Sequence, residues 1–414
     1  MPRTLSLRRS LPLAILALAA LPTVSAAAAA ERTMTSVGGR VADLPPGHDV
    51  VVLVGGDNRP TQLGAPLPRI VGTILEEAAL IRPDVVLWSG DTIYGYCEGR
   101  EAMEREHRRF LALATKVGVP LFNAPGNHEI RGNQTCATKP DCDGACAETL
   151  FESHYGSLYG SFDVSDVHFI ALDTEVVHEE NTIGGRQLEW LRGDLERNKD
   201  KRAILVFSHS EFFSSPLIDP GAAHGHEAIK NRDELHQLFR RYPVKAVFSG
   251  HEHLFWREKP EDHDGIAYFV AGGSGAPLYA PPERGGFSHY LLARVNGDKV
   301  QVDVVEPGRL YVEKAEEAAK PPAKARPREA RYWIVNSNDA ILPVRGMVIM
   351  VPRSFGPCDR LTAATELMRR EGVLVPVPIS IENAVVRGES CRLTLAVPVV
   401  PAGTSVPVVI RGTK

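Results

Sequence analysis

The chain has 414 residues, 43% of them hydrophobic and 24% charged, and its formal net charge is −4 at pH 7. This length and apolar content predict two or three domains with substantial cores. The nearly balanced charge argues against a protein that binds nucleic acid by bulk electrostatic attraction.

The first 30 residues are expected to form a secretory signal peptide. Three arginines, Arg3, Arg8 and Arg9, precede an apolar stretch that ends in small residues with several A-x-A cleavage points. A membrane anchor is the alternative, although the strongly apolar core is short for a span. No later stretch is long and apolar enough to cross a bilayer. The mature protein is therefore predicted to be soluble and exported, either periplasmic or secreted.

Residues 48–312 are predicted to form a large α/β domain. Amphipathic helical patterns alternate there with five apolar runs that indicate buried strands. The five runs are VVLVG at 51–55, VVLWSG at 85–90, VPLFNA at 119–124, AILVFS at 203–208 and KAVFSG at 245–250. Alternation of this kind predicts an α/β sandwich with helices over both faces.

The C-terminal part of the chain has a different composition. Residues 313–330 are charged, rich in Ala and Pro and almost free of large apolar residues, which predicts a linker. Residues 331–414 are then expected to form a small, mostly β domain with one helix near 360–371. This domain has no cluster of chemically active side chains, so its role stays open, and binding of an unidentified partner is one candidate.

All six cysteines lie beyond residue 30, and an even number in an oxidising compartment predicts three disulfides. Cys358 and Cys391 stand apart from the others and are expected to pair. The remaining four allow three pairings, which the sequence does not rank: Cys97, Cys136, Cys142 and Cys146. A zinc knuckle on the last three of these is the alternative, although they lack the tight C-x₂-C spacing. The segment 131–146 is predicted to be a disulfide-stapled loop over the site.

Each of the five predicted strands is followed by a polar side chain that can bind a metal. These residues are Asp57, Asp91, Asn127 with His128, His209, and His251 with His253. Open α/β sheets bind ligands outside the carboxyl ends of their strands, so the five loops are predicted to converge. Carboxylate, amide and imidazole ligands together suit zinc, manganese or iron. An Asp shared by two cations holds them about 3.5–4 Å apart, where they clamp a phosphate and activate water.

The order of these motifs resembles that of the calcineurin-like metallophosphoesterases. The shared residues are spread over 48–312, roughly two-thirds of the chain, and are Asp57, Gly90-Asp91, Gly126-Asn127-His128, His209, Gly250-His251 and His253. The resemblance implies a four-layer α/β/β/α sandwich with a dinuclear site that hydrolyses phosphate esters.

The resemblance also implies a role for each of these residues. The first metal would be bound by Asp57, Asp91 and His253. The second would be bound by Asp91, Asn127, His209 and His251, so that Asp91 bridges the two ions. His128 would meet the phosphate or the leaving-group oxygen. Because an imidazolium can donate a proton to a departing alkoxide, His128 is the predicted general acid.

One position departs from the family pattern. Members often have Asp-x-His in the first motif, whereas this chain has Arg59, which is cationic and has no lone pair for a metal. The purple acid phosphatase branch also lacks that histidine and uses the tyrosine of a GDxxY motif, which residues 90–94 fit. Tyr94 is thus expected to bind the first metal, and Arg59 to bind phosphate as a fixed cation. Further candidates for the crevice are His224, His226 and His289.

We therefore expect an exported, metal-dependent phosphoric ester hydrolase. Its cofactors would be two divalent or mixed-valence ions of iron, zinc or manganese, and its substrate a small-molecule phosphate ester. Monoesters are favoured through the resemblance to purple acid phosphatases, and a phosphodiesterase of the same fold is the alternative. A second alternative is a catalytically degenerate envelope protein that binds metal or a partner, because Arg59 departs from the family pattern.

Overall fold

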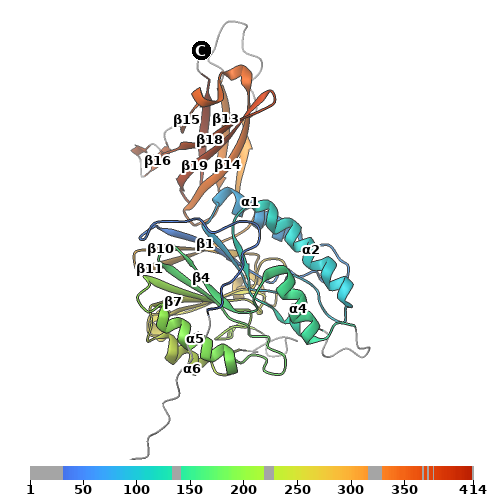
Figure 1. Ribbon diagram of the computed structural model, residues 1–414. Helices are drawn as coiled ribbons and strands as arrows, with labels where there is room; N and C mark the ends of the chain where they lie inside the picture. The colour runs from blue at the N-terminus through green and yellow to red at the C-terminus, as the bar shows by residue number, and fades with distance from the viewer. Residues whose placement is uncertain are drawn as a thin grey trace, which may run out of the picture.

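The computed structural model describes residues 31–132, 141–218, 228–315, 329–365, 368–370, 373–375 and 377–412 (Figure 1). The expected signal peptide, Cys136, His224 and His226 lie outside these residues. Within the described part of the chain, no helix is long and apolar enough to cross a membrane.

One five-stranded sheet carries the first three motifs. Its strand order is β11-β10-β1-β2-β3, with β1, β2 and β3 parallel and β10 and β11 antiparallel. The strands are β1 (Val50–Gly55), β2 (Val85–Trp88), β3 (Leu121–Asn123), β10 (Tyr290–Asn296) and β11 (Lys299–Val305). Every residue of β1 and β2 is buried, which explains why both were recognisable as continuous apolar runs.

A six-stranded sheet carries the remaining motifs. Its order is β4-β5-β6-β7-β9-β8. The strands are β4 (Gly160–Val164), β5 (Val167–Ala171), β6 (Ala203–Phe207), β7 (Val244–Ser249), β8 (Phe255–Glu258) and β9 (Ala267–Ala271).

The two sheets pack face to face, and helices cover their outer faces (Figure 1). One core lies between the sheets, where Val52 of β1 belongs to the same cluster as Phe207 of β6. On the outer face of the first sheet pack α1 (Arg69–Ile81) and α2 (Arg100–Val117), and on that of the second pack α5 (Gly185–Arg197) and α6 (Arg232–Phe239). This arrangement confirms the predicted four-layer α/β/β/α sandwich. Two further helices, α3 (Asn127–Ile130) and α4 (Gly144–Tyr155), follow β3.

The C-terminal region is a separate pair of sheets that packs on α1 (Figure 1). One sheet has the order β12-β13-β20-β15, another β14-β19-β18, and β16 and β17 form a short ribbon. The strands are β12 (Leu310–Lys314), β13 (Glu329–Asn336), β14 (Leu342–Pro352), β15 (Thr362–Thr365), β16 (Met368–Arg370), β17 (Val373–Val375), β18 (Ser380–Arg387), β19 (Ser390–Val400) and β20 (Thr404–Arg411). The mostly β character predicted for this region is confirmed.

Two details of this region differ from expectation. The helix expected near 360–371 is wrong, because β15 pairs with β20 and β16 with β17. Strand pairing overrides the weak helical propensity of that segment. Both ends of the expected linker are also strands: β12 pairs antiparallel with β13, so that Glu313 lies opposite Trp333. The segment therefore connects neighbouring strands of one sheet, and that sheet already begins at Leu310.

The described cysteines are all disulfide-bonded, as expected for an oxidising compartment. Cys358 and Cys391 are bonded, as predicted, and join the start of β19 to the turn before β15. Cys142 is bonded to Cys146, which excludes a zinc knuckle built on these two thiolates. Cys97 is also disulfide-bonded, and the described residues include no free cysteine. Half of the predicted stapled loop, residues 133–140, lies outside the described residues.

Candidate metal centre

The predicted ligands stand at the carboxyl ends of the strands, and three of them have a left-handed backbone. The φ angles are 58° at Asp57, 53° at Asp91 and 66° at His251. Such backbone strain persists only where surrounding contacts fix it. Here the main-chain N–H of His251 donates to Asp57 Oδ1 at 3.0 Å, and that of His128 donates to Asp91 Oδ1 at 3.0 Å. These contacts tie the first motif to the fifth and the second to the third.

Two glycines make this close approach possible. A Cβ on Gly250 would lie 2.1 Å from Oδ2 of Asp57, and a Cβ on Gly126 would lie 2.3 Å from Oδ1 of Asp91. Both distances are far shorter than any van der Waals contact. Any side chain at either position would therefore displace a predicted ligand.

The ligands predicted for the second metal lie next to His209. His209 Nε2 lies 2.8 Å from Asn127 Oδ1 and 3.4 Å from Asp91 Oδ1. His251 Nδ1 lies 3.1 Å from the same amide oxygen and 3.2 Å from His209 Nε2. Four donors about 2.0–2.1 Å from a tetrahedral ion are about 3.3 Å apart. These four distances, from 2.8 to 3.4 Å, are close to the spacing of ligand atoms around one cation.

The orientation of His209 supports the same interpretation. Its Nδ1 lies 2.6 Å from the main-chain oxygen of Ser89, which can only accept a hydrogen bond. Nδ1 therefore carries the hydrogen, and the lone pair of Nε2 is directed at the other donors. This arrangement, in which a carbonyl fixes the tautomer, is characteristic of metal-binding histidines.

At the predicted position of the first metal, a main-chain oxygen again fixes the orientation of a histidine, here next to Asp57. His253 Nδ1 lies 2.6 Å from the main-chain oxygen of Pro277, and its Nε2 lies 3.6 Å from Asp57 Oδ1. Asp57 Oδ2 and His253 Nε2 are buried and have no hydrogen-bond partner among the described residues. Buried polar atoms without partners are rare, and a carboxylate oxygen and an imidazole nitrogen in this state fit the ligand set of a cation. Ligand atoms of Asp57, Asp91 and His209 all lie within 4.8 Å of one another.

Burial and mutual charge perturb the pKa values of these groups. Burial raises the pKa of Asp57, and the neighbouring Asp91 raises it further. Burial also opposes ionisation of Asp91, but His128, His209 and Arg59 together lower its pKa. The pKa of His209 is lowered by burial, yet Asp91 and Asp57 raise it to about 9. A bound cation would take over the role of the proton that this cluster otherwise holds.

His128 faces the same cluster from the start of α3. Its Nδ1 donates to the main-chain oxygen of Tyr94, and its Nε2 lies 3.7 Å from Asp91 Oδ2. Burial, reinforced by the charge of Arg59, lowers the pKa of His128 to about 3. Nε2 is thus the nitrogen that can exchange a proton with a group bound at the site.

Arg59 lies inside the cluster rather than at its rim. Its side chain is 10% exposed, and its Nε lies 3.8 Å from Asp91 Oδ2. Tyr279 holds it from one side through a side-chain hydrogen bond. The Tyr279 ring also stacks on His253, with ring centroids 4.1 Å apart and planes 19° apart. Sequence reasoning missed Tyr279, because its loop carries no motif.

Among the described residues, Tyr94 makes no hydrogen bond or ring contact with Asp57, Asp91 or His253. Its main chain contacts His128 and Glu106, and its hydroxyl makes no hydrogen bond to another described residue. The chain reverses at Gly95, where φ is 66°, and it is Tyr96 that turns inward. The Tyr96 hydroxyl accepts a hydrogen bond from Asn127 Nδ2 at 3.2 Å, and its ring lies 4.3 Å from that of His128. A Tyr94–metal bond therefore stays a prediction.

Two other buried residues, Glu129 and His289, differ in their relation to the cluster. Glu129, which sequence reasoning also missed, accepts hydrogen bonds from the main-chain N–H groups of Asp91 at 2.9 Å, Thr92 at 2.6 Å and Gly126 at 2.9 Å. It thereby locks the second motif to the third. His289 lies outside the cluster, where its ring packs against Phe255.

Comparison with known proteins identifies the class of this domain. Residues 65–255 match the family model of the calcineurin-like phosphoesterases. The solved structure of a purple acid phosphatase from yellow lupin (Lupinus luteus) seeds is similar with a TM-score of 0.50 and 17% identity, over 63% of this chain and 52% of that chain. Residues 65–255 are thus similar to the calcineurin-like phosphoesterases, and the predicted resemblance is confirmed.

Curated relatives are themselves phosphatases. Purple acid phosphatase 21 of Arabidopsis thaliana is 33% identical over 202 residues, which are 46% of this chain and 44% of that protein. Acid phosphatase type 7 of Mus musculus is 27% identical over 212 residues, which are 48% of this chain and 46% of that protein. The chain thus spans slightly less than half the length of these two relatives.

Proposed function

We propose that this protein is an exported, metal-dependent phosphoesterase that hydrolyses phosphate monoesters at a dinuclear centre. The observation that carries the proposal is the position of Asp91 between two groups of buried ligands. Its Oδ1 lies 3.4 Å from His209 Nε2 in one group, and its ligand atom lies within 4.8 Å of that of Asp57 in the other. A carboxylate in this position can serve two cations at once.

Each group of ligands would hold one cation of iron, zinc or manganese. Asp57, Asp91 and His253 would bind the first, and Asp91, Asn127, His209 and His251 the second. The mixture of carboxylate, amide and imidazole ligands supports this choice of metals. When bound, the two ions supply Lewis-acid charge to the phosphate oxygens and activate the attacking water.

Arg59 supports a preference for monoesters. A phosphate monoester carries up to two negative charges on three terminal oxygens, whereas a diester carries one charge on two. The Arg59 guanidinium is always charged and is buried beside Asp91, where charge-assisted hydrogen bonds are strong. It would donate a hydrogen bond to the third oxygen of a monoester, which a diester lacks. His128 Nε2 faces the same space. The negative charge of a bound phosphate would raise the low pKa of His128, and the protonated ring would then donate its Nε2 proton to the leaving oxygen.

The disulfides support export. Cys142–Cys146 and Cys358–Cys391 are formed, and Cys97 is bonded as well. Disulfides persist in the periplasm and outside the cell, and are rare in the cytosol. The proposed site of action is therefore the periplasm or the medium.

A direct comparison of two substrates tests this function. The purified full-length chain, loaded in turn with zinc, manganese or iron, is assayed with p-nitrophenyl phosphate and with bis-p-nitrophenyl phosphate. We expect hydrolysis that a chelator abolishes, with a higher kcat/KM for the monoester. As a matched control, the exposed His178→Asn variant should behave like wild type, whereas His128→Asn should not. Faster diester hydrolysis would contradict the monoester preference. The absence of hydrolysis with every metal would contradict the proposed phosphoesterase activity.

A further inference from the structure

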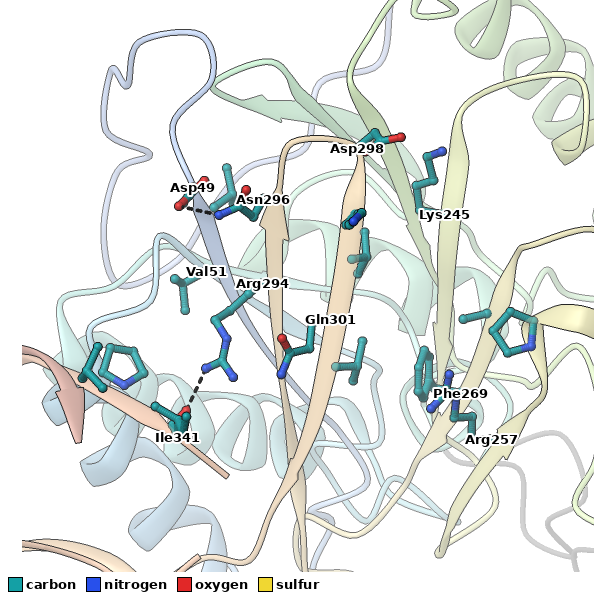
Figure 2. Close-up of a pocket in the computed structure, with 18 of the residues that line it drawn as sticks. Asp49, Val51, Lys245, Arg257, Phe269, Arg294, Asn296, Asp298, Gln301 and Ile341 are labelled. Carbon is teal, nitrogen blue, oxygen red and sulfur yellow. Dashed lines mark hydrogen bonds between the residues drawn. The ribbon is translucent and has the colours of Figure 1, made fainter. Parts of the chain in front are cut away.

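A groove lies at the opposite end of the strands from the metal centre. It has a volume of about 990 Å³ and is lined by the starts of β1, β7 and β9, by the β10–β11 hairpin, and by residues of the C-terminal region such as Ile341 (Figure 2). Asp49 of the groove precedes Asp57 of the metal centre by eight residues. At roughly 3.3 Å per residue of strand, this separation is about 26 Å. A molecule in the groove would not touch the phosphate.

The groove is positively charged in a chain whose formal net charge is negative. Only two carboxylates, those of Asp49 and Asp298, line it. Its five cationic residues are Lys245, Arg257, Arg294, Lys299 and Arg345. Of these, Arg294 is paired with Asp303 and Arg345 with Asp84.

The other three cations remain available. Lys245 and Lys299 form no ion pair with another described residue, and Arg257 lies over the ring of Phe269 at 5.5 Å from its centroid. Against the two lining carboxylates, these three cations leave one net positive charge in the groove for a ligand of the opposite sign. Charge complementarity of this kind sets the choice of partner and speeds association.

One wall of the groove is an unpaired strand edge. Among the described residues, β11 pairs only with β10 and ends the five-stranded sheet. The hairpin closes with a two-residue turn at Gly297, where φ is 57°, so that Asn296 lies opposite Lys299. In such a hairpin the closing pair is hydrogen-bonded and the pairs alternate along the ladder. Every second residue, beginning with Val300 and Val302, therefore presents its main-chain N–H and C=O to the free edge.

The other wall is the part of the six-stranded sheet that extends beyond β11. Figure 2 shows Gln301 on β11, with Arg294 on one side and Lys245, Phe269 and Arg257 on the other. Phe269 and Ala267 belong to β9, and Val300 and Val302 pack partly against the same core. An added strand would thus find apolar contacts on its inner face and cations around it.

We propose that an extended, acidic peptide segment of a partner protein binds here as an additional strand on β11. Its main chain would pair with Val300 and Val302, and apolar side chains at every second position would pack over the partly buried Ala267. Its carboxylates would face Lys245, Arg257 and Lys299. A polyphosphate would leave the free-edge C=O groups without donors. A second copy of this chain would bring like charges together, which disfavours it.

Fluorescence anisotropy with the full-length protein tests this proposal. The probe is a labelled synthetic peptide that alternates glutamate with valine, compared with one that alternates lysine with valine. We expect only the acidic peptide to bind. Val302→Pro removes a free-edge N–H without removing a bond to β10, and the double variant Lys245→Glu, Arg257→Glu reverses the charge. Each change should weaken binding by at least about tenfold.

Controls separate this site from general effects. Arg108→Glu, on the exposed side of α2, should bind the peptide like wild type, and all variants should hydrolyse p-nitrophenyl phosphate like wild type. The proposal is overturned if the acidic peptide does not bind, or binds equally to the Val302→Pro variant. Polyphosphate that binds wild type and Val302→Pro equally and displaces the peptide would indicate a simple polyanion site. A dimer in sedimentation that Val302→Pro abolishes would instead assign the edge to a second copy.

Discussion

Arg59 carries its Nε 3.8 Å from Oδ2 of Asp91, the carboxylate at the centre of the candidate metal centre. The charge of Arg59 acts on Asp57, Asp91, His128 and His253 alike. The departure from the family pattern therefore adds a fixed positive charge to the site. That charge does not move away with a metal or a proton, since a guanidinium stays protonated.

Neutralising Arg59 should lower kcat/KM more for monoesters than for diesters. We expect Arg59→Gln to lower kcat/KM for p-nitrophenyl phosphate by roughly 10–100-fold, the usual worth of one charge-assisted contact, with a smaller loss for the diester. Tyr279→Phe, which removes only the hydroxyl bonded to Arg59, should change activity in the same direction but less. Equal losses for both substrates would contradict a role in monoester selection.

His128 should affect turnover without affecting metal binding. His128→Ala is expected to lower kcat by roughly two to four orders of magnitude, the typical contribution of a positioned acid. The loss should be larger for an alkyl phosphate than for p-nitrophenyl phosphate, whose leaving group needs little protonation. Metal content, measured by elemental analysis, should match wild type. An unchanged rate on the alkyl phosphate would refute the assignment.

Removing Asp91 should weaken the binding of both metals, whereas removing a ligand of one metal should weaken the binding of that metal alone. Truncation in Asp91→Ala removes the shared carboxylate, so both ions should be lost or weakened together. His209→Ala should weaken mainly the second ion. Elemental analysis of the two variants after equal dialysis distinguishes these outcomes, and retention of one tightly bound ion in Asp91→Ala would count against a bridge.

A separate prediction concerns pH and stability. Burial disfavours the charged form of His168, but Asp163 at 2.7 Å and Asp194 at 2.8 Å raise its pKa above 6.5. The stabilisation of the folded state by protonated His168 should therefore be complete below about pH 6.5. It should be lost as pH rises through the higher pKa of His168 in the folded state. Urea unfolding of His168→Gln and wild type should give a difference in unfolding free energy that shrinks as the solution becomes alkaline. A difference that grows with pH would contradict this charge pairing.

The sequence predicted the parts of the site that follow from strand geometry. Asp57, Asp91, His209 and His253 stand directly after apolar runs, and the carboxyl ends of neighbouring strands necessarily meet. The alternation of strands and helices predicted a sandwich with helices over both faces, and the family resemblance implied its four layers. Pairing between distant segments carries no such local signal, which is why the β12–β13 pairing and the strands at 362–370 were missed.

Side chains that reach the site from irregular loops were also beyond prediction. Tyr279 comes from a loop without a motif, and only the fold brings it against His253. Tyr94 and Tyr96 are two residues apart, and the left-handed turn at Gly95 decides which one faces Asn127. A Gly between two aromatic residues was the one available hint that the chain reverses there.

The most direct test of a dinuclear phosphoesterase is the number of metal ions per chain, measured together with activity during metal titration. The metal-free full-length protein is titrated with zinc, manganese or iron while p-nitrophenyl phosphate hydrolysis and bound metal are followed. We predict that activity rises in step with occupancy and reaches its plateau near two ions per chain. A plateau at one ion, or two bound ions without hydrolysis of any phosphate ester, would contradict the account.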